Sequence, residues 1–437
     1  MIDDYQAALN FIHGRTKFKK IPTLDRMKRF LAELGNPQDG LTYIHVTGTN
    51  GKGSTVAMVR DALIGQGLTV GTFTSPFITR FNERIQYQGQ PIADDDLVRL
   101  TRRVQLVVEK LDRILPTGGP TEFEIDTAIM FCYMAEKKPD VVILEVGIGG
   151  LYDSTNVIVP KVSVITTVGW DHMKYLGDTL GAIAHQKAGI IKEKVPIVIG
   201  KLPSEAHRVI VNEAANLNAP VYEEGVDFNV RKVNQHGLIS QIIYDGIGLH
   251  HFASRLGLPG DYQVENAAVA ITIVQLFMVQ ENLPLAPADL KQSLAATTWP
   301  GRMEIVSEEP TVILDGAHNL PGIQALVNTI HNDLGDRDVY LLVAILADKQ
   351  YDLMLGELAS LGNVHIMVTN FAGPSANRPS ADLDDITADI RSRYPIKYAK
   401  HWQRGLESIA TQLSADDVLI VTGSLYFISE VRHLFKD

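Results

Sequence analysis

Residues 43–55 read Tyr-Ile-His-Val-Thr-Gly-Thr-Asn-Gly-Lys-Gly-Ser-Thr, and this stretch decides the fold. Its first five residues form a largely apolar run, which predicts a buried strand. A glycine-rich turn then leads into the helix-compatible residues 56–64. A strand, a glycine-rich loop and a helix start bring backbone N–H groups and the positive helix end to one point, and Lys52 adds a full charge. We expect a phosphate group to bind there.

The loop is a variant of the phosphate-binding motif G-x-x-x-x-G-K-[ST]. Val46 stands where the first glycine of that motif belongs, and Gly53 follows the lysine. A glycine-rich turn with a solvated lysine is the alternative interpretation. The preceding strand, the following helix and the hydroxyl groups of Ser54 and Thr55 favour a nucleotide phosphate, with one hydroxyl available for magnesium.

Short apolar runs alternate with helix-like segments from residue 41 onward, which predicts a parallel sheet flanked by helices. In the first series we expect strands at residues 43–47, 69–73, 141–146, 162–167 and 196–199. The loosely alternating stretch 228–252 contains His236-Gly237 and Asp245-Gly246, which predicts antiparallel hairpins at the edge of the first domain. A helix is expected at about residues 263–279.

The segment Thr297-Thr298-Trp299-Pro300-Gly301 is rich in turn residues, and the alternation of strands and helices restarts after it. In this second series we expect strands at residues 311–314, 339–344, 364–369, 396–399 and 418–422. The sequence therefore predicts an N-terminal P-loop ATPase domain at residues 1–298, with a parallel sheet and edge hairpins. It predicts a smaller, doubly wound α/β domain at residues 299–437.

Composition excludes several classes of protein. The 437 residues suffice for two or three domains, and 45% hydrophobic residues supply a core. With 40 Lys and Arg against 51 Asp and Glu, the net charge of -11 disfavours nucleic acid and anionic lipid as partners. A single cysteine, Cys132, forms no internal disulfide and no cysteine-based zinc site.

The residues at the start of the chain and the apolar runs indicate a cytoplasmic protein. Residues 1–5 have neither the basic region nor the apolar stretch of a secretory signal. The apolar run 267–279 is broken by Gln275 and is too short to span a bilayer. We expect a soluble protein with no membrane partner.

Three polar side chains stand at the ends of predicted strands, where open α/β sheets bind their ligands. Ser75 follows the second strand, Glu145 lies in the third and His172 follows the fourth. Glu145 is the most informative, because a carboxylate among apolar residues is costly to bury unless a cation is near. Each residue also has a purely structural interpretation: Ser75 as a turn residue before Pro76, Glu145 as an ion-paired carboxylate and His172 as a loop histidine. A magnesium role is least expected for His172, because Mg²⁺ prefers oxygen ligands.

Lys187 is predicted to be buried. On a helix its neighbours three and four residues away are all apolar: Ile183, Ala184, Ile190 and Ile191. Burial should lower the pKa of its amine. Such a lysine is either paired with a carboxylate or neutral and nucleophilic enough to take up CO₂.

The stretch T-G-T-N-G-K-G-S at residues 47–54 resembles the ATP loop of the Mur ligase superfamily, in its folylpolyglutamate synthase and dihydrofolate synthase branch. Further matching motifs follow in the order of that branch: T-S-P-F at 74–77, F-N-E-R-I at 81–85, E-V-G-I-G-G at 145–150, D-S-T-N at 153–156, H-Q-K-A-G-I-I-K at 185–192, D-G-A-H-N at 315–319 and T-G-S-L-Y at 422–426. The fold of that branch is an ATPase domain followed by a smaller α/β domain.

The resemblance also implies roles for individual residues. Those implied to bind ATP are Thr49, Asn50, Gly51, Lys52, Gly53, Ser54, Asn266, Arg302 and Asp315. Those implied to hold magnesium, as two ions, are Ser75, Glu145 and His172. The implied catalytic residues are Lys52, Lys187 in carbamylated form, Asp315 and His318. Those implied to contact the folate or the incoming glutamate are Phe77, whose ring can stack on a pterin, Arg84, His318 and Ser424.

The activity implied by the resemblance is that of an ADP-forming ligase in folate biosynthesis and one-carbon metabolism. It adds L-glutamate to the carboxylate of a reduced folate through an acyl phosphate, as a monomer. Addition of glutamate to dihydropteroate stays open. A peptidoglycan-precursor ligase is disfavoured by the F-N-E-R-I motif and by the missing N-terminal UDP-binding domain. An ATP-regulated binding protein without ligase activity would not need the metal candidates, Asp315 or His318.

Overall fold

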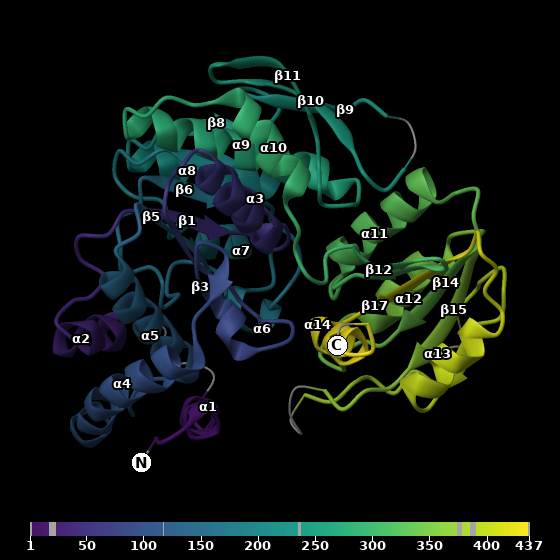
Figure 1. Cartoon of the computed structure of the whole chain (residues 1–437), viewed down its shortest axis with the longest axis horizontal. Helices are drawn as coiled ribbons and strands as arrows, with labels where there is room; N and C mark the ends of the chain where they lie inside the picture. Colours follow the sequence, from purple (N-terminus) through teal and green to yellow (C-terminus); the bar gives the residue numbers. More distant parts are fainter. Residues whose placement is uncertain are drawn as a thin grey trace. The chain divides into compact units, whose positions relative to one another are not determined.

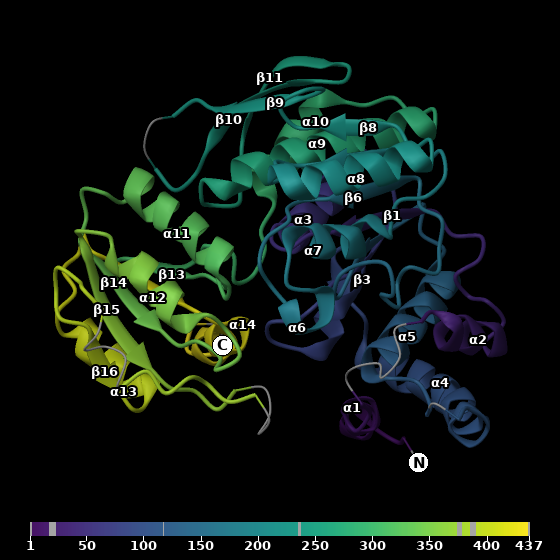
Figure 2. The ribbon, with the colours of Figure 1, turned by 180° about the vertical axis from the view of Figure 1, so that it is seen from behind.

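The computed structural model describes residues 2–16, 23–116, 118–234, 237–373, 378–384 and 390–435. The chain forms two compact units, drawn in Figures 1 and 2. Unit 1 contains residues 1–229, 246–250 and 268–293, and unit 2 contains residues 230–245, 251–267 and 294–437. The domain boundary expected after residue 298 stays a prediction, because the two units interleave in the sequence.

Unit 1 is built on an eight-stranded sheet with the order β4-β3-β2-β5-β1-β6-β7-β8. Its strands are β1 (Tyr43–Thr47), β2 (Val70–Phe73), β3 (Ile85–Tyr87), β4 (Gln90–Pro91), β5 (Val141–Glu145), β6 (Val162–Ile165), β7 (Ile197–Ile199) and β8 (Val221–Glu223). The neighbouring strands in the run β2-β5-β1-β6-β7-β8 are all parallel. At the edge of the sheet, β3 is antiparallel to β2, and β4 is antiparallel to β3. The predicted parallel sheet is confirmed, with β1 paired on both sides.

The helices of unit 1 precede or follow these strands along the chain. They are α1 (Tyr5–His13), α2 (Asp25–Glu33), α3 (Lys52–Gly65), the 3₁₀ helix η1 (Phe81–Arg84), α4 (Asp94–Ile114), α5 (Glu122–Lys137), α6 (Met173–Leu176), α7 (Leu180–Ala188) and α8 (Ser204–Asn216). Two further helices have residues in both units: α9 (Tyr262–Gln280) and α10 (Pro287–Ala296). The short connection from β1 to α3 is the predicted glycine-rich loop.

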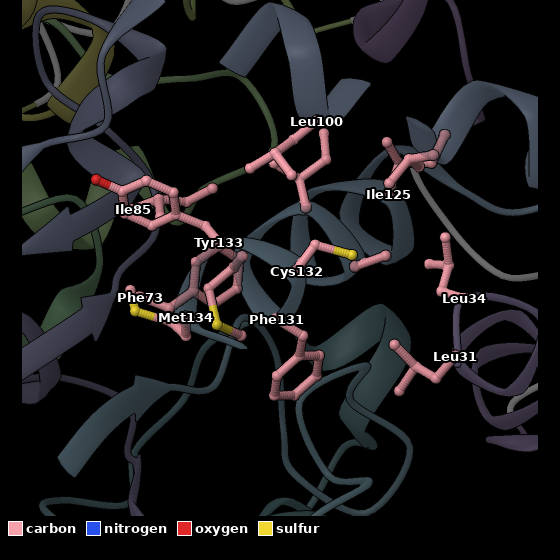
Figure 3. Close-up of a cluster of buried hydrophobic side chains, with 14 of the residues drawn as sticks. Leu31, Leu34, Phe73, Ile85, Leu100, Ile125, Phe131, Cys132, Tyr133 and Met134 are labelled. Atoms are coloured by element: carbon pink, nitrogen blue, oxygen red, sulfur yellow. The ribbon is translucent and has the colours of Figure 1, made fainter. Parts of the chain in front are cut away.

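A hydrophobic cluster anchors one end of unit 1. Figure 3 shows side chains from α2, β2, β3, α4 and α5 gathered there, including Leu31, Phe73 and Phe131. Phe81 and Ile85, which belong to the F-N-E-R-I motif, are members of the same cluster. Burying a side chain of this size contributes about 1.5 to 3 kcal/mol. The cluster therefore fixes the backbone of that motif against α5.

Unit 2 contains a six-stranded sheet with the order β12-β13-β17-β14-β15-β16. Its strands are β12 (Glu304–Glu308), β13 (Thr311–Leu314), β14 (Val339–Val343), β15 (Val364–Thr369), β16 (Lys397–Ala399) and β17 (Val418–Thr422). Its helices are α11 (Leu320–Asp333), α12 (Tyr351–Ala359), α13 (Trp402–Ala410) and α14 (Leu425–Arg432). The predicted α/β alternation is confirmed, and β12, which pairs antiparallel with β13, was not predicted.

The stretch 228–252 forms strands, as expected, but residues 230–245 and 251–252 belong to unit 2 rather than to the first unit. It contributes β9 (Asn229–Lys232), β10 (Gln241–Gly246) and part of β11 (Leu249–Arg255) to a separate three-stranded sheet. It does not extend the large sheet, whose edge hairpin is β3–β4. Lys232, at the end of β9, donates to both Asp261 and Asp333 at 2.6 Å, which connects β9 to α11. His236 lies outside the described residues.

Helix α9 confirms the helix expected at about residues 263–279. We expected the apolar run 267–279 to be too short to span a bilayer. The whole helix has 19 residues and is long and apolar enough to cross a membrane, by length and composition alone. In its apolar window, 83% of the residues are buried inside the fold. This burial is typical of a core helix.

Candidate functional site

Two glycines give the phosphate loop its shape. Gly51 precedes α3 with φ +85°, a left-handed conformation that favours glycine. At Gly48 a Cβ atom would lie 1.9 Å from Thr166 Oγ1, so no larger residue fits there. The loop therefore passes directly over the end of β6.

Two hydroxyl residues after β6 fix the loop backbone. The Thr49 amide donates to Thr167 O at 2.9 Å, and the Asn50 amide donates to Thr167 Oγ1 at 2.9 Å. Thr166 Oγ1 in turn donates to Asn50 O at 2.6 Å. Sequence reasoning missed these two threonines, although adjacent hydroxyls at a strand end were the available signal.

The first turn of α3 directs its backbone amides toward the loop. Groups in a first turn have no carbonyl acceptor within the helix. In this loop they belong to Lys52, Gly53 and Ser54. The Lys52 ammonium lies over the loop and donates to Gly48 O at 2.9 Å and to Thr49 O at 3.3 Å. Positive charge and helix N–H groups therefore converge at one place, as a phosphate site requires.

Ser75 and Glu145 lie together at the same edge of the sheet. Glu145 is 4% exposed, and its Oε2 accepts the Ser75 amide at 3.2 Å. Glu145 is also the register partner of Val46 in β1, one residue before the strand ends. Carboxylate and hydroxyl oxygens are ligands that Mg²⁺ prefers. The chemistry of this pair fits a magnesium ion.

His172 lies after β6 and precedes α6. It has φ +50°, and its Nε2 is 3.9 Å from Asp171 Oδ2. Among the described residues, no three or more His, Cys, Asp or Glu side chains form a group that could hold a metal ion. The structure thus brings Ser75 and Glu145 together and pairs His172 with Asp171, which the sequence did not single out.

Lys187 is buried near the end of α7, with 2% of its surface exposed. Burial lowers the pKa of its amine well below the ordinary value, and the Lys52 charge acts in the same direction, whereas Asp171 opposes it. This confirms the predicted direction. The placement of Ile190 and Ile191 on the helix was wrong, because α7 ends at Ala188, although both side chains are buried.

Arg84 and Phe77 are adjacent in unit 1. The Arg84 Cζ atom is 5.3 Å from the centre of the Phe77 ring and 5.7 Å from that of Phe81. The Glu83 carboxylate accepts the amides of Ile78 at 2.9 Å and Arg80 at 3.0 Å, which closes the loop before η1. The Phe77 ring and the Arg84 guanidinium therefore lie side by side, next to a loop that the Glu83 hydrogen bonds hold in place.

In unit 2, Asp315 is the centre of a buried network. It is 3% exposed and accepts from the Tyr262 hydroxyl and from the amides of Met303 and Ala317, each at 3.0 Å. Burial raises the pKa of the Asp315 carboxyl, and the nearby charge of Arg302 opposes that shift. The structure thus brings Arg302 and Asp315 together, and Tyr262 is a partner that the sequence did not reveal.

The remaining candidates of unit 2 lie around the same loop or on α9. His318 Nδ1 is 2.8 Å from Gly316 O, so this nitrogen carries a proton and donates it. The Gly423 amide donates to Ala317 O at 3.1 Å, which brings the T-G-S loop to this point, and Ser424 is 1% exposed. Asn266 is buried on α9, where its Nδ2 donates to Gln263 Oε1 of the same helix at 2.9 Å.

Comparison with known proteins agrees with this geometry. Residues 46–274 match the Mur ligase middle domain, and residues 301–425 match the Mur ligase glutamate ligase domain. The chain therefore belongs to the Mur ligase family. It is 39% identical to the dihydrofolate synthase/folylpolyglutamate synthase of Bacillus subtilis over 100% of both chains. It is 38% identical to the folylpolyglutamate synthase of Lacticaseibacillus casei, with 98% of each chain covered.

A solved structure described as an FPGS-AMPPCP-folate complex superposes on the chain with a TM-score of 0.85. It is 36% identical, and the match covers 99% of this chain and 100% of that one. Within the Mur ligases, the chain falls in the folylpolyglutamate synthase and dihydrofolate synthase branch, which confirms the resemblance seen in the motifs.

A first prediction concerns the cost of burying Lys187. Its folded pKa is lowered, so the folded state binds fewer protons than the unfolded state, and stability rises with pH toward the unfolded pKa. In CO₂-free buffer at pH 7, Lys187→Met should raise the free energy of unfolding by about 1 to 3 kcal/mol. Urea denaturation measures this, with the exposed Lys194→Met as control. A loss of stability of similar size would contradict it.

Proposed function

We propose that this chain is an ATP-dependent ligase that joins L-glutamate to the terminal carboxylate of a folate, with release of ADP and phosphate. The observation that carries the proposal is the full-length match to the Bacillus subtilis dihydrofolate synthase/folylpolyglutamate synthase, together with the phosphate loop at β1. The FPGS-AMPPCP-folate complex supports both ligands, since AMPPCP is an ATP analogue. The name of the Bacillus subtilis relative favours dihydropteroate as a second acceptor.

Activation is the first step. An oxygen of the folate carboxylate attacks the γ-phosphorus of ATP, the bond from that phosphorus to the β–γ bridging oxygen breaks, and ADP leaves. The product is an acyl phosphate. Lys52 and the first-turn amides of α3 offset the charge on the transferring group, a contribution that depends on their fixed positions.

Glutamate addition is the second step. The neutral glutamate amine attacks the acyl carbon, a tetrahedral intermediate forms, and the bond from carbon to the phosphate oxygen breaks. One proton of the amine must leave during this step. His318 suits that role, because its Nδ1 proton is held by Gly316 O and a neutral ring then presents Nε2 as an acceptor.

Magnesium, when bound, supplies positive charge that offsets the charge of the phosphates. Ser75 and Glu145 would hold it through their oxygen atoms, with His172 as a third ligand, and we assign two ions to the site. Lys187 is assigned as carbamylated: its neutral amine attacks CO₂, an N–C bond forms, and a proton leaves. The group at this buried position then changes from a neutral amine to a negatively charged carbamate.

The other residues of the proposal bind and orient. Asn266, Arg302 and Asp315 are assigned to the nucleotide, while Phe77, Arg84 and Ser424 are assigned to the folate and the glutamate. The enzyme is proposed to act as a monomer in the cytoplasm. The reduced, buried thiol of Cys132 suits that compartment.

The second prediction is that ADP forms over many turnovers only when glutamate and a pteroyl carboxylate are both present. The reason is that phosphoryl transfer needs the acceptor carboxylate, and the acyl phosphate needs the amine. A coupled ADP-release assay with folate, dihydropteroate and a UDP-muramyl peptide measures the dependence, and omission of magnesium should stop it. Equal ATP turnover with and without a pteroyl compound would refute the assignment.

The third prediction concerns Lys52→Ala and Glu145→Ala. Lys52→Ala removes the positive charge proposed to offset the transferring group, and Glu145→Ala removes a proposed magnesium ligand. In each variant kcat should fall about 10²-fold or more while the fold is retained. Steady-state kinetics and circular dichroism measure the two effects. Lys201→Ala, which removes a lysine with an exposed side chain from the same unit, serves as control. A kcat near that of the unaltered enzyme would remove the residue from the mechanism.

The fourth prediction is that Lys187 carries a carbamate in the active enzyme. With ¹³CO₂, a carbamate carbon should appear in the NMR spectrum of the unaltered protein and be missing in Lys187→Ala. That variant should lose activity and regain part of it when a short carboxylic acid is added, because the acid restores a negative charge in the vacated space. An unmodified amine together with no rescue would contradict the assignment.

A further inference from the structure

Asp126 is a buried carboxyl group for which the chemistry above has no use. It lies in the first half of α5 and is 1% exposed. Within the described residues, neither of its oxygens has a hydrogen-bond partner. Buried polar atoms nearly always have one, so a carboxyl group without any requires an explanation. The ion pair that it does form is with Arg84, whose Nε lies 3.8 Å from Asp126 Oδ2.

Arg84 is held loosely by its other neighbours. Its Nε is buried without a hydrogen-bond partner in the described part of the chain, and its side chain is 12% exposed. The rings of Phe77 and Phe81 attract the guanidinium but do not fix its rotation, since a ring face offers no directional acceptor. The Asp126 charge is therefore what gives the side chain a direction.

The backbone around Arg84 does not depend on Asp126. The Glu83 carboxylate accepts amides of its own loop, and the Thr74 amide donates to Arg84 O at 2.9 Å. Phe81 and Ile85 on either side belong to the hydrophobic cluster. Loss of the Asp126 charge would therefore move the Arg84 side chain and leave the loop in place.

We propose that Asp126 is a positioning residue for folate binding, whose carboxylate aims the Arg84 guanidinium so that its other N–H groups, beside the Phe77 ring, meet the pteroyl substrate. This inference rests on the proposed function, in which Phe77 and Arg84 contact the folate. It adds a residue to substrate recognition that makes no contact with the substrate itself.

The charged groups around Asp126 come from three elements. Burial raises the pKa of Asp126 to about 7; Arg84 of η1 lowers it, Glu122 of α5 raises it and His13 of α1 lowers it. His13 Nδ1 and Glu122 Oε1 are 2.9 Å apart and form a pair of their own. The carboxyl group therefore ionises as the pH rises through neutrality, and the ionised form holds Arg84. Folate KM should fall over the same interval.

The test is Asp126→Asn, which keeps the size of the side chain and removes its charge. At pH 8 the folate KM should rise about 10-fold, with kcat and the KM values for ATP and glutamate changed less than about 2-fold. Between pH 6 and pH 8 the folate KM of the variant should be flat, whereas that of the unaltered enzyme falls. Asp333→Asn, another buried carboxyl change but in α11, should leave the folate KM and its pH dependence as they are.

Thermal stability separates positioning from a purely structural role. An ionised carboxylate with a raised pKa opposes folding above its unfolded pKa, so Asp126→Asn should melt no lower than the unaltered protein at pH 8. A lower melting temperature with an unchanged folate KM would show a structural role and overturn the proposal. So would a pH dependence that persists in the variant, because it would belong to another group.

Arg84→Gln keeps the test decisive if Asp126→Asn does not fold. It leaves the carboxyl group and removes the cation through which that group acts, so the pH dependence of the folate KM should vanish. A dependence that survives in Arg84→Gln would refute the inference. Failure of the proposed function looks different: the unaltered enzyme would then form no ADP in response to folate, and the inference would fall with it.

Discussion

The fixed backbone between β1 and α3 is the constraint on which the rest of the structure depends. Gly48 must pass within contact distance of Thr166, and the Thr49 and Asn50 amides are bound by residues after β6. The loop can hold this path only because β1 lies between β5 and β6 in a parallel sheet. On its other side β5 pairs with β2, which places Glu145 at the end of β5 beside Ser75. The order of the central strands therefore determines where the phosphate site lies.

Both units bury ionisable side chains that are proposed to act in binding or catalysis. Lys187, Glu145, Asp126 and Asp315 are each almost fully buried, and burial shifts the pKa of Lys187 downward and that of Asp126 and Asp315 upward. Groups of this kind cost stability, so a fold keeps them where a ligand or a reaction uses their charge. In the proposed mechanism, the carbamate, the metal, the folate and the nucleotide each use one of these four groups.

The sequence predicted what depends on local pattern. Continuous apolar runs located β1 and β5, and the glycine-lysine loop located the phosphate site, because each is set by residues close in the chain. Contacts between residues distant in the chain were not predicted. They are the hydrogen bonds of Thr166 and Thr167 with the phosphate loop, of Tyr262 with Asp315 and of Lys232 with Asp333. Asp126 was missed because its ion pair joins α5 to η1, a contact between distant residues that the local sequence pattern does not show.

The central claim is that the folate carboxylate is phosphorylated before glutamate attacks. Oxygen isotopes test it directly. With ¹⁸O in both oxygens of the acceptor carboxylate, one turnover should transfer one ¹⁸O atom to the released phosphate, since the bridging oxygen of the acyl phosphate leaves with phosphorus. Mass spectrometry of the phosphate measures the transfer. Phosphate without label, formed at the rate of the ligated product, would contradict the claim.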